Sequence, residues 1–278
     1  QAIQISLAAR DCPGTSLGIA RDSGAKTLSE LRGKRVGFVV GSPTLNQGTL
    51  ALLAFAGLTE KDVRIVEFSS YGAMWKGMLS NEVDAAFATT ITGPTKELES
   101  SPRGLVWPAL SFSDTAGWER LRKIGPFFTQ HKATCGAGGL SAGKPIEMGS
   151  YPYPIYAVYG TQGENDVYML TKAMIEGYGA YKDGAPGASR LDAKLQTKNW
   201  AVPVHKGAVR ALREARAWSN DQERHNNNLM RRQETLAAAW DDYIRTNPPS
   251  ASREFSNGWM NARAVALSRA GMANGLVD

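Results

Sequence analysis

The sequence has few cysteines and no long apolar run, and both absences narrow the class of protein. No stretch reaches the 18 or more consecutive apolar residues of a membrane-spanning helix. The segment from Gln1 lacks the basic and apolar regions of a signal peptide, which fits a mature secreted chain, a trimmed chain or a cytosolic protein. Cys12 and Cys135 have no zinc-site spacing. They allow one disulfide, which the sequence alone does not decide.

The motifs of several enzyme classes are also missing. Neither the lysine-bearing phosphate loop GxxxxGK[ST] nor the dinucleotide pattern GxGxxG occurs. The chain has three histidines, at 131, 205 and 225, and we recognise no nucleophile with a partner base. The glycine-rich run 135–139 has no strand and helix around it, so we interpret it as a loop. We therefore predict a protein that is not an enzyme, with no catalytic residues, no cofactor and no metal site.

The charge is basic, at +6 with a pI near 9.3, but it is spread along the chain. The densest basic stretch contains Arg224, Arg231 and Arg232 and lies on a helical pattern with acidic residues between them. Such a pattern is typical of a solvated helix face. No run of Lys and Arg alternates with aromatic residues, so nucleic acid is not an expected partner. A small acidic ligand fits the charge.

The first part of the chain alternates short apolar strands with helical patterns. Strands are predicted at 15–20, 35–40 (buried along its whole length), 63–68 and 83–88, and helices at 28–31, 46–56, 71–79 and from 94 to 98. Strands that alternate with helices through short loops are typical of an α/β fold with a parallel sheet.

From Lys206 onward the chain is predicted to be mainly helical. Elsewhere, further strands are predicted at 3–9, 105–108 and 155–159 and helices at 116–123 and 164–177, and a final helix is predicted at 250–270. Residues 208–246 form one or two helices, with a polar break at 226–228. The Gly-, Ser- and Pro-rich segment 132–154 is either a long ordered loop or a crossing between lobes.

Two loops are candidates for ligand binding because each leaves a strand and enters a helix. The first contains Ser42 and Thr44, and the second contains Thr89 and Thr90. Helix amino termini bind anions through free N–H groups, and hydroxyls there also serve as plain helix caps. Tyr71 and Tyr151 belong to a set of aromatics that either wall a cleft or pack in the core. The rest of that set is Trp75, Tyr153, Tyr156 and Tyr159.

Four segments in this order resemble the TAXI family, the solute-binding subunits of one branch of the tripartite ATP-independent periplasmic (TRAP) transporters. They are TSLGIARDSGAKTLSELRGKRVGF, GSPTLNQGTLALLAFAGLTEKDV, SSYGAMWKGMLSNEVDAAFATTITGPTKELES and WAVPVHKGAVRALREA. The similarity covers roughly residues 5–215. No single motif is diagnostic, and the order and separation of the four carry the resemblance.

The resemblance implies a two-lobe periplasmic binding protein fold of type II. Residues 20–150 would form the ligand-binding lobe, and 1–19 with 151–278 the other lobe, the hinge strands and extra carboxyl-terminal helices. Family members carry a further segment in front of the matched region, so the first lobe is expected to be shortened at its amino terminus.

The same resemblance implies capture of a small organic anion, such as an amino acid or dicarboxylate, in the periplasm for the membrane subunits of a TRAP transporter. In that case Ser42, Thr44 and Asn46 donate hydrogen bonds to the ligand. Thr89 and Thr90 line the opposing loop, and Tyr71 and Tyr151 wall the cleft. The alternatives are a cytosolic ligand-sensing domain and an enzyme on a similar α/β fold.

Overall fold

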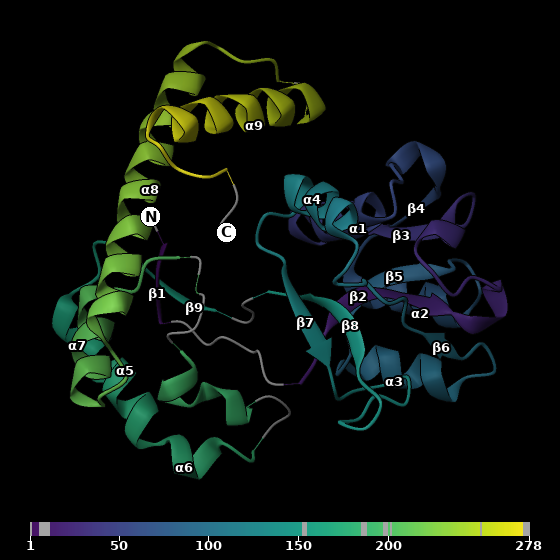
Figure 1. The fold of residues 1–278 in the computed structure, drawn as a ribbon, viewed down its shortest axis with the longest axis horizontal. Helices are drawn as coiled ribbons and strands as arrows, with labels where there is room; N and C mark the ends of the chain where they lie inside the picture. The colour runs from purple at the N-terminus through teal and green to yellow at the C-terminus, as the bar shows by residue number, and fades with distance from the viewer. Residues whose placement is uncertain are drawn as a thin grey trace. The chain divides into compact units, whose positions relative to one another are not determined.

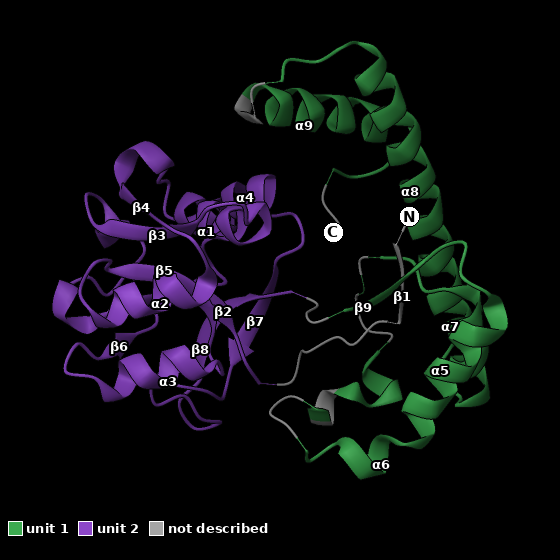
Figure 2. Ribbon diagram, turned by 180° about the vertical axis from the view of Figure 1, so that it is seen from behind, with its two compact units in different colours: residues 1–9, 152–278 green, residues 10–151 purple. Residues whose placement is uncertain are grey.

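The structure is a computed structural model in which the chain forms two compact units. It describes residues 2–5, 12–151, 155–184, 188–196, 200, 202–250 and 252–274. One unit, here called the sheet unit, is residues 10–151, and the other, the helical unit, is residues 1–9 with 152–278 (Figure 2). The predicted α/β class and two-part organisation are confirmed. No helix among the described residues is long and apolar enough to cross a membrane.

A mixed seven-stranded sheet forms the centre of the sheet unit. The strands are β2 (Thr15–Ala20), β3 (Arg35–Val39), β4 (Arg64–Phe68), β5 (Ala85–Thr89), β6 (Leu105–Val106), β7 (Thr129–Ala133) and β8 (Ile146–Ser150). The order is β4-β3-β5-β2-β8-β7, with β6 paired to β2. The strands β4, β3 and β5 are parallel, as predicted, whereas β2 runs antiparallel to β5, β6 and β8. The predicted boundary at residue 20 thus differs from the observed one, because β2 belongs to this sheet.

Helices cover both faces of this sheet (Figure 1). The helices α1 (Pro43–Phe55) and α4 (Thr115–Ile124) pack on one face, and α2 (Tyr71–Leu79) and α3 (Gly93–Ser100) on the other. Successive residues of a strand point to opposite faces. Accordingly, Ala85 and Phe87 of β5 join the core beneath α1 and α4, whereas Ala86 and Ala88 join the core beneath α2 and α3.

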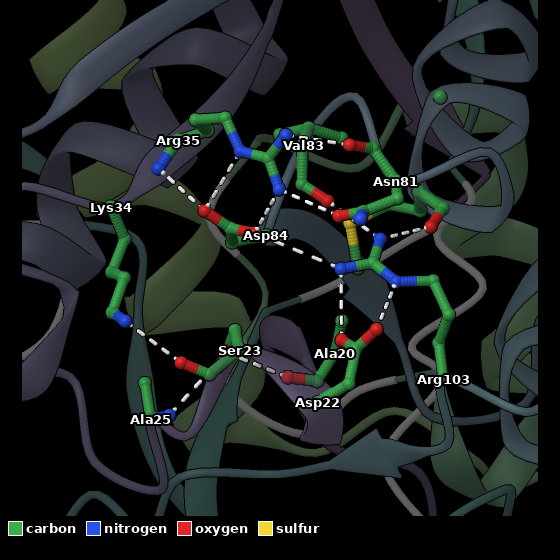
Figure 3. A network of polar contacts seen from close by, with 12 residues as sticks. Ala20, Asp22, Ser23, Ala25, Lys34, Arg35, Asn81, Val83, Asp84 and Arg103 are labelled. Carbon is green, nitrogen blue, oxygen red and sulfur yellow. Dashed lines mark hydrogen bonds and ion pairs between the residues drawn. The ribbon is translucent and has the colours of Figure 1, made fainter.

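A network of ion pairs ties the strands together at the amino ends of β3 and β5 (Figure 3). The Asp84 carboxylate accepts hydrogen bonds from the backbone N–H of Arg35 at 2.9 Å and from its guanidinium at 2.6 and 3.1 Å. The buried Arg103 lies 3.7 Å from Asp84 and pairs with Asp22 at 2.8 Å. Burial alone would raise the pKa of Asp84, but the hydrogen bonds from Arg35 and the charges of Arg35 and Arg103 outweigh burial and lower it.

The segment 132–154 contains a strand that sequence reasoning missed. Residues 146–150 form β8, which pairs antiparallel with β7 in a hairpin. A disulfide joins Cys12, just before β2, to Cys135 in the loop of this hairpin. A cross-link between residues so far apart in the chain stabilises a fold by about 2–5 kcal/mol.

The helical unit has a small sheet and five α-helices in its described part. The elements are β1 (Ala2–Ile5), β9 (Tyr156–Tyr159), α5 (Glu164–Glu176), α6 (Tyr178–Tyr181), α7 (Lys206–Glu214), α8 (Asn220–Arg245) and α9 (Ser252–Arg269). The strands β1 and β9 pair antiparallel. The core includes Val167, Trp200, Val204, Ala208 and Leu212.

The predicted polar break at 226–228 is wrong, because α8 continues through it. The buried Asn226 accepts a hydrogen bond from the backbone N–H of Val204 at 2.7 Å and donates one to its carbonyl at 3.2 Å. A buried polar side chain whose hydrogen bonds are satisfied is compatible with a continuous helix, so Asn226 does not end α8. The actual break is at 215–219, where Ser219 begins α8 with a capping box.

Other predicted boundaries shift by a few residues. The strand predicted to be buried to Val40 ends at Val39, and Val40 is 61% exposed. The helix predicted from Asn46 begins at Pro43, whose ring suits a first helical position. Residues 6–9 of the first predicted strand, and Tyr153, lie outside the described residues. Short 3-10 helices occupy Arg21–Ser23, Ser29–Leu31, Glu60–Asp62, Ala188–Leu191 and Ala193–Leu195.

We expect Asp84→Asn to lower the free energy of unfolding by roughly 3–5 kcal/mol, because it breaks the ion pair of a buried carboxylate with Arg35 and removes one of the two carboxylates beside the buried Arg103. Asp242→Asn, which breaks an exposed ion pair with Arg245, is the matched control and should change little. Because the folded-state pKa of Asp84 is lowered, its contribution is complete above the ordinary carboxyl pKa. It is lost as the pH falls through the lowered value. Denaturant titrations from neutral to acid pH test this, and an equal loss in both variants would contradict it.

Candidate functional site

Strand ends and helix starts converge at the edge of the sheet opposite the Asp84 network. The parallel strands β3, β4 and β5 all finish at this edge, and each turns directly into a helix, α1, α2 and α3 respectively. Because β2 is antiparallel to β5, with Thr15 opposite Thr89, β2 starts at the same edge. The strand β8 ends there, since Gly149 is opposite Thr15. Ligands of open α/β sheets bind at this kind of edge.

The three helix amino termini at this edge leave their positive ends uncompensated. None of α1, α2 and α3 has an acidic residue in its first turn. By contrast, α5 begins with Glu164 and Asp166, α8 with Asp221 and Glu223, and α4 has Asp114 as its N-cap, whereas α7 shares the lack of a first-turn acid. Acidic side chains normally offset the dipole of a helix at its amino terminus. Their absence from three adjacent helices favours an anionic ligand at this edge.

Two predicted hydroxyls at the start of α1 are accessible. Ser42 is the half-buried N-cap residue, and its side chain makes no capping hydrogen bond. Thr44 is exposed in the first turn. The predicted donor Asn46 is instead engaged with β3, because it accepts from the backbone N–H of Val39 and donates to its carbonyl, both at 2.9 Å. Asn46 therefore positions the loop and retains a single amide hydrogen for a ligand.

The two predicted threonines after β5 differ in accessibility. Thr89 is half-buried, whereas Thr90 has no exposed surface. The Thr90 hydroxyl accepts from the backbone N–H of Gly14 at 3.2 Å and donates to the carbonyl of Cys135 at 2.7 Å. Its hydroxyl proton is therefore used within the fold. Thr90 ties the start of β2 to the disulfide loop beneath the edge.

The two predicted tyrosines occupy different surroundings at this edge. Tyr71 is the first residue of α2, is half-buried, and its ring centre is 6.3 Å from that of Trp75. Tyr151 follows β8 and packs against Phe87, Phe127 and Phe128, with ring centres 5.5 to 6.4 Å apart. Tyr151 is thus mainly part of an aromatic cluster, and Tyr71 the more peripheral ring.

Two residues at this edge, Ser70 and Val40, escaped the sequence reasoning, whereas Thr92, the N-cap residue of α3, belongs to the predicted loop of Thr89 and Thr90. Val40, two residues before Ser42 in the chain, has an exposed apolar side chain. Ser70 caps α2 by accepting from the backbone N–H of Ala73 at 3.1 Å. The sequence does contain a signal for Ser70 as a helix cap, because Ser70, like Ser42, lies between a predicted strand and a predicted helix.

A separate cavity of about 560 Å³ lies within the helical unit and contains none of the predicted site residues. It is lined by Gly160, Glu164, Val204, His205, Lys206, Val209, Arg210, Arg213, Glu223, Asn226, Asn227 and Met230. All three of its lysine and arginine residues are already paired, Lys206 with Glu164 at 3.1 Å, Arg210 with Glu214 at 3.8 Å and Arg213 with Glu223 at 2.6 Å. This pairing makes the cavity less suited to an anion than its basic residues suggest.

His205, on the wall of this cavity, has a structural role. Its Nδ1 accepts from the backbone N–H of Gly207 at 3.1 Å and so caps α7. Burial lowers the pKa of His205, an effect partly opposed by the nearby backbone of Gln162. No group of three or more His, Cys, Asp or Glu residues in the described ranges is placed to hold a metal ion.

Two segments match the serine pattern GxSxG, 14–18 and 139–143, and sequence reasoning overlooked both. A nucleophile elbow requires a turn from a strand into a helix. Ser16 instead lies inside β2 with no exposed surface, and Ser141 lies in the loop between β7 and β8. Neither segment has the geometry of a catalytic elbow.

A comparison with known protein families identifies the family to which the chain belongs. A model of the NMT1-like family matches residues 15–215, so the chain belongs to the NMT1-like family. That match covers the sheet unit from β2 onward and extends through α7. No curated protein gives a match.

Several solved structures show weak similarity. A periplasmic sulfonate-binding protein SsuA from Methylobacillus flagellatus KT is 26% identical over 32% of this chain and 26% of its own, with a TM-score of 0.26. The alkanesulfonate-binding protein SsuA from Xanthomonas axonopodis pv. citri is 12% identical over 82% and 58%, with a TM-score of 0.36. The desulfurization enzyme DSZB with biphenyl-2-sulfinic acid is 14% identical over 97% and 79%, with a TM-score of 0.39. Similarities at this level do not assign a ligand or an activity.

We expect Thr90→Val to lower the free energy of unfolding by about 1–3 kcal/mol, because it removes two buried hydrogen bonds while preserving the shape of the side chain. Thr44→Val, an identical change at an exposed position, should leave stability nearly unchanged. Denaturant unfolding of both variants measures the difference. A stable Thr90→Val protein would show that Thr90 does not tie β2 to the disulfide loop.

Proposed function

We propose that this chain is a solute-binding protein that captures a small organic anion at the carboxyl edge of β3, β4 and β5. The observation that carries the proposal is the set of three adjacent helix amino termini without an acidic residue in the first turn. The first-turn N–H groups of a helix have no partner within it, so they are available to a carboxylate or sulfonate. Membership of the NMT1-like family is compatible with this reading.

The geometry gives the candidate residues different roles. Ser42 and Thr44 supply hydroxyl donors at α1, and Thr89 supplies one at the end of β5. Asn46 and Thr90 hold these loops through their bonds to Val39, Gly14 and Cys135. This division assigns direct ligand contact to the first three residues and positioning to the other two.

The apolar part of the solute would rest on side chains at the same edge. Tyr71 and Tyr151 flank it, and Val40 adds exposed apolar surface. A solute with an acidic group and a short apolar body, such as an amino acid or a dicarboxylate, fits both features.

We place the protein in the periplasm, with the membrane subunits of a TRAP-type uptake transporter as partner. The Cys12–Cys135 disulfide supports an oxidising compartment, since disulfides persist in the periplasm and are rare in the cytosol. The resemblance of four segments within roughly residues 5–215 to the TAXI branch supports the transporter class. In this role the protein binds and releases its solute unchanged, so it needs no cofactor.

A ligand screen tests the proposal. We expect at least one carboxylate or sulfonate from a panel of amino acids, dicarboxylates, keto acids and alkanesulfonates to raise the melting temperature. A neutral amide or alcohol of the same shape should not. Thermal shift followed by calorimetry measures this. If only neutral solutes bind, or if a bound compound is chemically converted, the proposal is wrong.

A paired variant locates the site. Ser42→Ala combined with Thr44→Ala should weaken binding of a screened ligand by about tenfold or more, because two hydrogen bonds of roughly 1 kcal/mol each are lost. The control is Thr27→Ala combined with Ser29→Ala, two exposed hydroxyls that precede β3 and hydrogen-bond each other at 3.0 Å. Equal affinity in the two double variants would remove the α1 loop from the site.

A further inference from the structure

Two arginines from different helices converge on the chain that follows α9. After α9 the chain turns at Gly271, which has φ 69°, and the backbone N–H of Met272 bonds to the carbonyl of Leu267 at 2.8 Å. Residues 273 and 274 come next. Arg232 of α8 donates to the carbonyl of Ala273 at 2.5 Å and to that of Asn274 at 2.9 Å.

Arg263 of α9 reaches the same point. Its Nη2 also donates to the carbonyl of Asn274, at 2.9 Å. Two nitrogens that each lie 2.9 Å from one oxygen are at most 5.8 Å apart. The guanidinium groups of Arg232 and Arg263 are therefore neighbours, and we call these two residues the arginine pair.

No carboxylate balances this pair in the part of the chain that the structure describes. The ion pairs there, with a limit of 4.0 Å, include neither Arg232 nor Arg263. Arg103 is equally buried, at 7% exposure against 8% for Arg232, yet it has Asp22 and Asp84 beside it. Buried charges are normally paired, so the buried Arg232 and its neighbour Arg263 lack, among the described residues, the carboxylates that Arg103 has.

Several donors of the pair remain unused. A guanidinium carries five N–H donors and no acceptor. Arg232 spends two of its nitrogens on carbonyl groups, and its buried Nε has no hydrogen-bond partner. Arg263 spends one nitrogen on a carbonyl and places another 4.0 Å from the sulfur of Met260. The pKa of both arginines is lowered by burial, and that of Arg232 also by the charge of Arg263.

We propose that the arginine pair binds a small oxoanion, of the sulfate or phosphate class, between α8 and α9. Such an anion accepts several hydrogen bonds in the fork geometry that guanidinium groups present, and it neutralises two adjacent positive charges at once. The arginine pair lies in the helical unit, outside the carboxyl edge of the sheet and outside the cavity around His205. It is a second anion site, independent of the captured solute.

The test uses inorganic phosphate and the full chain. Titration calorimetry against phosphate, at constant ionic strength maintained with chloride, should give saturable binding. Sulfate should compete. Absence of saturable binding to the wild-type protein would overturn the proposal without any variant. Methyl phosphate is titrated in parallel to separate two sources of the anion. An affinity equal to that of phosphate means that the arginine pair also accepts the terminal group of a larger molecule, and a weaker affinity means that it selects the free ion.

Two arginine variants locate the ion. Arg263→Gln should weaken phosphate binding at least tenfold, and Arg263→Lys, which keeps the charge but loses the fork, should have an intermediate affinity. Arg269→Gln removes an exposed arginine of the same helix and should bind as the wild type does. Circular dichroism verifies that each variant is folded. If Arg269→Gln weakens binding as much as Arg263→Gln, phosphate is attracted by the overall positive charge and not bound by the arginine pair, and the proposal fails.

The double variant Ser42→Ala with Thr44→Ala separates this inference from the proposed function. Phosphate binding should be unchanged in that protein, while binding of an organic solute is weakened. Loss of phosphate binding in the double variant would place the ion at the sheet edge and overturn the assignment to the arginine pair.

Discussion

The carboxylate of Asp84 is the contact on which the geometry of the sheet unit depends. It fixes Arg35 at the start of β3 through both backbone and side chain, and the backbone carbonyl of Asp84 accepts from Ala20 at the end of β2 at 2.8 Å. Arg103 extends the network to Asp22 (Figure 3). Three strands are thus held in register at one edge. Because strands are short and stiff, fixing one edge also sets where the loops of the opposite edge lie.

The opposite edge has a different electrostatic character. There the polar contacts are made by backbone N–H groups and neutral hydroxyls, and Thr90 and Asn46 are used to hold loops. The protein therefore keeps its buried ion pairs at the amino ends of β3 and β5 and presents uncompensated helix dipoles at their carboxyl ends. We propose that this separation of structural ion pairs from helix amino termini is what lets the carboxyl edge bind an anion.

Sequence reasoning recovered much of this edge because its signals are local. A buried strand followed by a hydroxyl and a helical pattern identified Ser42, Thr44 and Thr89, and the helix 71–79 was predicted with the bounds observed for α2. It failed where the deciding contacts are distant. The strand β8 is defined by its pairing with β7. The helix α8 continues through residues 226–228 because Asn226 accepts a hydrogen bond from the backbone of Val204. The Thr90 hydroxyl is buried in hydrogen bonds with Gly14 and Cys135. The prediction of a solvated helix face is wrong for Arg232, because nothing in the helical pattern shows that this side chain is buried and donates to the carbonyls of Ala273 and Asn274.

The most direct test of the central claim is an NMR titration of backbone amides with a ligand found by screening. We expect the largest shifts in the first turns of α1, α2 and α3, at residues 42, 44 and 45, at 70–73, and at 92, 93 and 95, since Pro43 and Pro94 have no amide proton. The chemical shifts of the amides that line the cavity around His205 should remain nearly unchanged. Shifts confined to residues 205–213 and 226–230 would place the ligand in the helical unit and contradict the assignment of the solute site to the sheet edge.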